Sequence, residues 1–219
     1  MRAQYTAELE QLRLQVEVMA VRVDQNLERM RGVLDTGDEE TAAQALGADD
    51  EIDAMNLSLT ERCYDLLRRE QPVATDLRLV MSVIRITGEL ERIGDLALRA
   101  VKLAPDHALV SSRHQTWDIV LAMADEAIER YREAMRAWAT EDLALATELS
   151  HGSKSMTPLS ERLSAELINL GGPDAAAIAV RTLVAGQALD RIADHAAVMG
   201  ARMRYLITGD PDHLAAEVR

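Results

Sequence analysis

Apolar residues recur every three or four positions along the first 35 residues of the chain. The positions in this stripe are Tyr5, Leu9, Leu12, Val16, Met19, Val23, Leu27, Met30 and Leu34. This spacing places the apolar side chains on one face of an α-helix. Signals for β-structure are weak, because β-branched runs are short and no hairpin dipeptide separates alternating segments. The pattern therefore predicts an all-α protein.

Capping and helix-breaking residues divide the chain into six predicted helices. The breaks fall at Thr36-Gly37-Asp38, Gln71-Pro72, Pro105, Thr140-Glu141-Asp142, Gly171-Gly172-Pro173 and Gly209-Asp210-Pro211. Each helix spans roughly 25–35 residues, or about 40–50 Å. Short connections between long helices imply antiparallel bundles. Gly47 and Gly152 lie inside the second and fifth predicted helices, where we expect kinks or irregular turns.

One nine-residue motif occurs twice, at an offset of 99 residues. Residues 89–97 read Glu-Leu-Glu-Arg-Ile-Gly-Asp-Leu-Ala, and residues 188–196 read Ala-Leu-Asp-Arg-Ile-Ala-Asp-His-Ala. A repeat of this length is too long for a solenoid unit. We therefore predict two tandem three-helix bundles related by internal duplication, the first over residues 1–106 and the second over residues 107–219.

The repeated motif places two carboxylates on one helix face, because Glu91 and Asp95 are four residues apart. The same motif gives Asp190 and Asp194 in the second copy. Like charges at this spacing repel each other slightly, so something should compensate them. A divalent metal ion, bound by the carboxylate oxygens, is one alternative. A solvated, salt-bridged helix face is another, and the available cations recur every seven residues beside Glu91 and Asp95, at Arg78, Arg85, Arg92 and Arg99.

Composition removes several classes of function. The 219 residues include 24 Lys and Arg and 37 Asp and Glu, and the resulting net charge of −13 argues against nucleic-acid binding. The single cysteine, Cys63, excludes an internal disulfide and multi-cysteine metal sites, and we expect a buried, inert thiol. No nucleotide-binding or standard hydrolase motif is present. Without a secretory signal or a long apolar run, a cytoplasmic protein is expected.

The repeated stretches, Glu89 to Ala97 and Leu189 to Ala196, resemble the E(D)xxxD signature of the PhoU family of phosphate-transport regulators. Two further segments resemble that family in the same order. They are the acidic run Asp49-Asp50-Glu51-Ile52-Asp53 and the segment Gln71-Pro72-Val73-Ala74, which is followed by Asp76-Leu77-Arg78. The resemblance spans essentially the full length.

The resemblance implies two three-helix bundles and no enzymatic activity. It implies negative regulation of the phosphate-starvation response and modulation of phosphate uptake. The implied partners are the ATPase subunit of the phosphate ABC transporter, PstB, and a phosphate-sensing histidine kinase. The protein would then lie in the cytoplasm, peripheral to the inner face of the cell membrane, with a homodimer left open. We expect the four arginines and the adjacent acidic face to be docking surfaces.

Some members of the family bind iron or other metals through these acidic motifs. The resemblance therefore implies metal ligands at Glu91, Asp95, Asp190 and Asp194, with weaker candidates at Asp49, Glu51 and Asp53. Four residues after the second acid, where the family often carries Asn or Asp, this chain has Arg99 and Val198. The Glu-x-x-His spacing of ferritin-like sites is also missing from both copies of the motif. We therefore rank a carboxylate-bridged metal site for iron or another divalent ion below regulation. We expect His195 to form a hydrogen bond between the bundles, with metal ligation or a pH-sensitive contact as alternatives.

Overall fold

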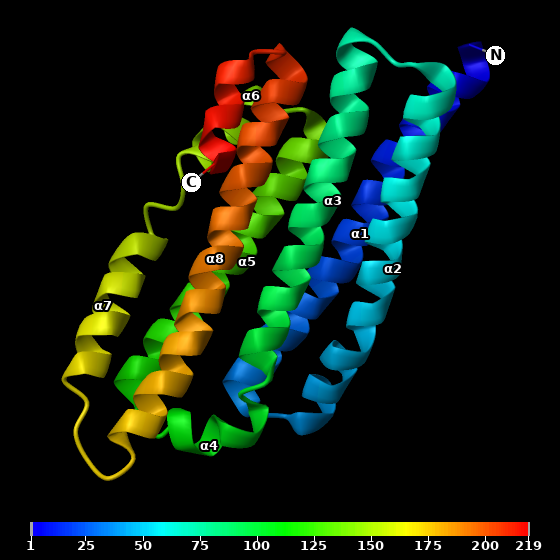
Figure 1. Cartoon of the computed structure of the whole chain (residues 1–219). Coiled ribbons are helices and arrows are strands. Elements are labelled where there is room, and N and C mark those ends of the chain that lie inside the picture. Colours follow the sequence, from blue (N-terminus) through cyan, green and yellow to red (C-terminus); the bar gives the residue numbers. More distant parts are fainter. Residues whose placement is uncertain (1, 219) are drawn as a thin grey trace.

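The computed structural model describes residues 2–218, with side chains described for residues 4–215. This part of the chain is helical and contains no strand (Figure 1). The longer helices are α1 (Arg2–Thr36), α2 (Glu39–Glu70), α3 (Ala74–Val101), α5 (His114–Thr140), α6 (Leu143–Ser150), α7 (Met156–Ile168) and α8 (Ala175–Thr208). The short ones are η1 (Ala104–Asp106), α4 (His107–Val110) and η2 (Pro211–Val218).

The helices form two bundles, as the repeat predicted. Helices α1, α2 and α3 form one bundle, and α5, α6, α7 and α8 form the other. In each bundle the middle segment, α2 or α6 with α7, runs antiparallel to the first and last helices (Figure 1). The apolar stripe predicted in the first helix is the core of the first bundle, since its positions from Leu9 to Leu34 are at most 7% exposed. The all-α class and the amphipathic pattern are therefore confirmed.

The two bundles lie side by side through two pairs of helices, α3 with α8 and α1 with α5. In the second pair, the hydroxyl of Tyr131 donates a 2.6 Å hydrogen bond to the carbonyl of Ala20. Nearby, Nε of Arg132 donates to Asp24 at 2.8 Å. Buried apolar residues of both bundles belong to one contiguous cluster. The bundles therefore share a core as well as polar contacts.

The prediction of one long fifth helix is wrong, because α6 ends at Ser150 and α7 begins at Met156. Gly152 lies between them with a φ of +80°, a left-handed conformation that suits glycine. The buried guanidinium of Arg130 on α5 donates to the carbonyls of Leu149 and Gly152, both at 3.2 Å. These bonds give both carbonyls at the break a side-chain donor, so the break is stabilised from α5. The irregular turn expected at Gly152 is confirmed, whereas α2 continues as helix through Gly47.

The connection between the bundles is anchored on the end of α1. The carbonyl of Leu34 accepts a 2.9 Å hydrogen bond from the indole of Trp117 on α5. The same carbonyl lies 3.1 Å from Nε2 of His107 on α4. The predicted domain boundary, between residues 106 and 107, falls between η1 and α4. It stays a prediction.

Candidate functional site

Both copies of the repeated motif lie in the middle of long helices, the first on α3 and the second on α8. In each copy the inner acid, Glu91 or Asp190, is half-buried. The outer acid, Asp95 or Asp194, is exposed. The isoleucine between them in sequence is fully buried in both copies. The duplication has therefore preserved the exposure of these positions as well as their acidic or apolar character.

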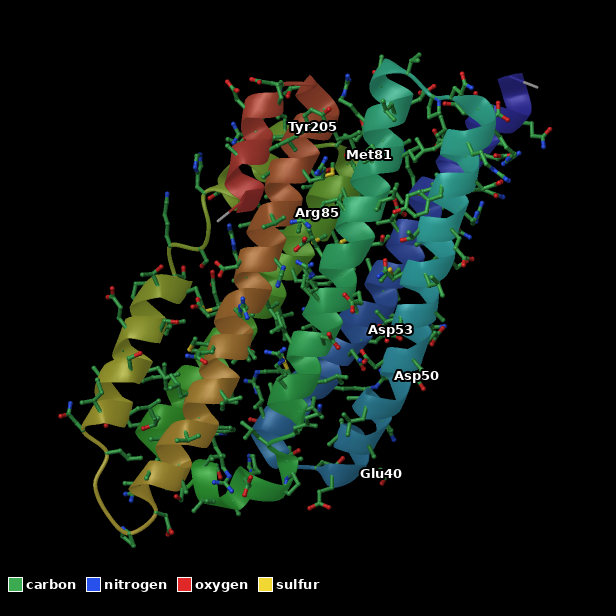
Figure 2. All side chains as sticks on the ribbon, in the orientation of Figure 1. Glu40, Asp50, Asp53, Met81, Arg85 and Tyr205 are labelled. Carbon is green, nitrogen blue, oxygen red and sulfur yellow. The ribbon has the colours of Figure 1, made fainter. Side chains whose placement is uncertain are left out.

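The first acid pair is joined by two carboxylates of α2, forming an α2–α3 acidic cluster of Asp49, Asp53, Glu91 and Asp95. Burial raises the pKa of Glu91, and the charges of Asp95, Asp53 and Asp49 raise it further. Burial likewise raises the pKa of Asp49, with added repulsion from Asp53 and Asp95. Figure 2 shows Asp53 on α2 beside α3. The structure therefore gathers residues from two of the segments that the sequence had singled out.

Glu51, the third weaker candidate, is not part of this cluster. Its carboxylate accepts a 3.1 Å ion pair from Nε of Arg22 on α1. Residues 51 and 53 are 200° apart around a helix, so they point to different sides of α2.

The second acid pair faces α7 and has fewer carboxylates around it than the first pair. Burial raises the pKa of Asp190, as does the charge of Asp194, while a hydrogen bond from Ser160 on α7 lowers it. Burial also raises the pKa of Asp194, against the opposing charges of His195 and Arg191. Here α7 supplies a hydroxyl where α2 supplies carboxylates to the first pair.

The negative charge of the two acidic sites would attract a cation, but their side chains are not arranged as a set of metal ligands. Carboxylate oxygens are ligands that hard divalent ions prefer. Within residues 4–215, however, no group of three or more His, Cys, Asp or Glu side chains is placed so that it could hold one metal ion. Arg99, one turn after Asp95, is exposed. Metal binding at these residues stays a proposal.

The four arginines that recur every seven residues on α3 occupy two different environments. Nε of Arg78 donates to the carbonyl of Leu206 on α8 at 3.3 Å. Arg85 forms a 3.1 Å ion pair with Glu89 on its own helix. Both are partly buried, whereas Arg92 and Arg99 are exposed. The more exposed part of the predicted docking surface is therefore the second half of α3, and docking there stays a prediction.

Sequence reasoning missed the role of Glu89, whose side chain is 1% exposed. Its Oε2 lies 2.5 Å from Nδ1 of His195, so α3 and α8 meet through this pair. The hydrogen bond predicted for His195 between the bundles is thus confirmed, and its partner is new. The repeat carried a signal, because the second copy has Ala188 in place of Glu89 and the first has Leu96 in place of His195. The two polar exceptions to the repeat are partners.

Two other expectations concern Cys63 and the membrane. Cys63 is fully buried in α2, and burial raises the pKa of its thiol to about 12. The expectation of a buried, inert thiol is met, since a nucleophilic cysteine needs an accessible thiolate. As for the membrane, no helix in the described part of the chain has the length and apolar character required to cross one.

Comparison with known proteins identifies one family. A family model described as the PhoU domain matches residues 16–104. The phosphate-specific transport system accessory protein PhoU homolog of Pseudomonas aeruginosa is 30% identical over 216 residues, which cover 94% of this chain and 86% of that protein. The accessory protein PhoU of Serratia marcescens is 28% identical over 218 residues, covering 98% of this chain and 89% of its own length.

Solved structures agree with this assignment over both bundles. The crystal structure of PhoU from Pseudomonas aeruginosa has a TM-score of 0.86 and 29% identity, and covers 94% of this chain and 100% of its own. The phosphate transport system regulatory protein PhoU from Streptococcus pneumoniae shares the fold, with a TM-score of 0.75 at 22% identity. The likeness thus runs through both copies of the motif, and the chain belongs to the PhoU family.

Proposed function

We propose that this protein is a negative regulator of the phosphate-starvation response and a modulator of phosphate uptake. It would act as a cytoplasmic adaptor, peripheral to the inner face of the cell membrane, and would bind the ATPase subunit of the phosphate ABC transporter and a sensor histidine kinase. Relatives named as accessory proteins of phosphate-specific transport systems support this proposal. Its main structural support is that the same exposed Arg-x-x-Asp surface occurs on both α3 and α8.

The proposed mechanism is docking through charged helix surfaces rather than a chemical step. Arg92 with Asp95, and Arg191 with Asp194, present opposite charges one turn apart on exposed faces. Complementary charge across an interface speeds association and selects partners more than it adds affinity. Such a surface suits a signal that must be made and released as phosphate supply changes.

Binding to the purified ATPase subunit of the same organism tests the proposal. We expect the wild-type chain to be retained on the immobilised ATPase and Arg92→Glu to reduce retention at least tenfold, a loss of about 1.4 kcal/mol. Arg162→Glu is the matched control, because Arg162 is an exposed arginine on α7. It lies two residues from Ser160, so it points away from Asp190. Lack of retention of the wild-type chain would contradict the proposal.

We propose a carboxylate-bound metal, iron or another divalent ion, as the second candidate function. Its support is the α2–α3 acidic cluster, where burial and then the mutual repulsion of the carboxylates raise the pKa of Glu91 and Asp49. A cation would relieve that repulsion. Elemental analysis of the purified protein is the test, with the Asp95→Ala plus Asp194→Ala variant beside it. At least one metal per chain, lost in the variant, is the expected result. Less than one metal per chain, unchanged in the variant, would contradict this function.

A further inference from the structure

Helices α3 and α8 are exchanged by a pseudo-twofold axis that passes between them. Glu89 lies across from His195, and Arg78 lies across from Leu206. Each step forward along α3 is therefore matched by one step back along α8. Counting from the first contact, Arg92 comes level with Ile192, and Ile93 with Arg191. Since Arg92 and Arg191 are equivalent in the repeat, the axis passes close to both of them.

The axis also fixes which way equivalent residues face. A twofold axis that exchanges two antiparallel helices is perpendicular to the plane that contains them. Equivalent residues on α3 and α8 therefore face the same side of that plane. Figure 1 shows α3 and α8 together in front of α1 and α5, so this side is open. Arg92 and Arg191 are both exposed, so they lie on this open side, one on either side of the axis.

Acidic residues flank these two arginines on both sides. Glu91 lies toward α2, close enough to Asp53 and Asp49 on that helix for their charges to contribute to its raised pKa. Asp190 lies toward α7, because its carboxylate is hydrogen-bonded to Ser160. Across the helices, moving outward from the axis toward α2 or toward α7, the surface changes from basic to acidic. We call this the α3–α8 face: Arg92 and Arg191 at the centre, flanked by Glu91 with Asp95 and by Asp190 with Asp194.

A second copy of this chain does not suit the α3–α8 face. Two such faces stacked on a common axis would bring Arg92 and Arg191 opposite the same arginines, whatever the rotation between the copies. Like charges placed face to face across an interface oppose association. The charge pattern instead suits a different protein, with carboxylates at its centre and cations on either side.

The symmetry adds a further requirement. A pseudo-twofold face is best matched by a surface with a twofold axis, where each subunit offers the same residues once. We propose that the α3–α8 face binds a homodimeric protein across its twofold axis, so that one chain engages both subunits. This inference rests on the proposed function and deepens it, the partner being the transporter's ATPase subunit in dimeric form.

Stoichiometry and paired charge reversals test the inference. Light scattering of the purified complex should give one chain per ATPase dimer. Arg92→Glu and Arg191→Glu should each weaken binding to the dimer, by about tenfold or more and by factors that agree within about threefold. Arg162→Glu should leave binding unchanged, and circular-dichroism melting should show that all three variants are folded.

The outcomes separate this inference from the proposed function. Two chains per ATPase dimer, or a loss of binding in only one of Arg92→Glu and Arg191→Glu, would overturn the symmetric docking while leaving the partner in place. Failure of the wild-type chain to bind the ATPase would overturn both. The stoichiometry is measured on the wild-type chain, so the inference stays open to refutation even if a variant does not fold.

Discussion

Nδ1 of His195 lies 2.5 Å from Oε2 of Glu89, across the interface between α8 and α3. The carboxylate of Glu89 is almost completely buried and also lies 3.1 Å from Nη2 of Arg85. A buried carboxylate is tolerated when basic partners compensate it, and removing one member leaves the others unpaired. This contact therefore joins the shared core and the Tyr131 and Arg132 contacts in holding the two bundles together.

Removal of Glu89 should destabilise the protein strongly. We expect Glu89→Ala to lower the free energy of unfolding by about 2–4 kcal/mol, because Arg85 and His195 lose a buried partner. Urea denaturation measures this loss. Glu61→Ala, which removes an exposed carboxylate on α2, should change stability by less than about 0.5 kcal/mol.

The repeat itself supplies a second variant. Glu89→Ala combined with His195→Leu reproduces the apolar residues found at the equivalent positions, Ala188 and Leu96. We expect this double variant to regain at least half of the stability lost in Glu89→Ala, since a buried ion pair is often replaceable by apolar residues. Equal stability of Glu89→Ala and the wild-type chain would show that the contact contributes nothing.

Neutralising Glu91 should stabilise the protein at neutral pH. Burial and the charge of Asp95 raise the pKa of Glu91 above its usual 4.5, so the folded state binds this proton more tightly than the unfolded state. The stability that Glu91 contributes through this proton is fully present below pH 4.5 and is lost as the pH rises through the raised pKa. We expect Glu91→Gln to gain about 0.2–0.5 kcal/mol at pH 7.

The same gain should shrink as the pH falls through the raised pKa of Glu91 and should be gone below the usual value of 4.5. Denaturation of both proteins at several pH values measures it, with Glu61→Gln as the exposed control. A Glu91→Gln variant that is less stable than the wild-type chain at pH 7 would show that the charged form of Glu91 is favoured in the fold.

Two glycines in open space should respond oppositely to alanine. No heavy atom outside the local backbone lies within 4 Å of a Cβ built at Gly47 or Gly152, so only backbone conformation distinguishes them. Gly47→Ala in α2 should stabilise by about 0.5–1 kcal/mol. Gly152→Ala should cost about 1–2 kcal/mol, because its φ is +80°. Thermal denaturation of the two variants measures both effects. If both substitutions changed the stability in the same direction, the left-handed turn at Gly152 would be contradicted.

Tyr131 should stabilise the second contact between the bundles. Tyr131→Phe removes the 2.6 Å hydrogen bond to the carbonyl of Ala20 and should cost about 1 kcal/mol. Tyr64→Phe is the matched control, because the Tyr64 side chain is 60% exposed on α2. Equal stabilities of the two variants in urea would count against a role for the Tyr131 hydroxyl.

Helical periodicity and turn residues were sufficient to predict the fold class, because these features depend on local sequence, and the repeat at an offset of 99 residues predicted the two bundles. The break between α6 and α7 was harder to predict, because it needs Arg130 from another helix. The arginines show a similar limit. A seven-residue spacing drifts by about 20° per heptad on a straight helix. Along α3 this drift carries the series from Arg78, against α8, to Arg99, in solvent.

The candidate site was predicted in part for the same reason. Spacing along one helix placed Glu91 beside Asp95, and the acidic run in α2 supplied Asp49 and Asp53. The contact between Glu89 and His195 spans 106 residues of sequence, and only the packing of α3 on α8 brings the two side chains together. Such a pair follows from tertiary structure rather than from periodicity.

The role in phosphate regulation is tested most directly by expression of a phosphate-starvation reporter in a strain that lacks this gene and grows in high phosphate. We predict that the reporter is switched on in this strain and that the wild-type chain, supplied in trans, switches it off again. Normal repression of the reporter in the deletion strain would contradict the proposed function.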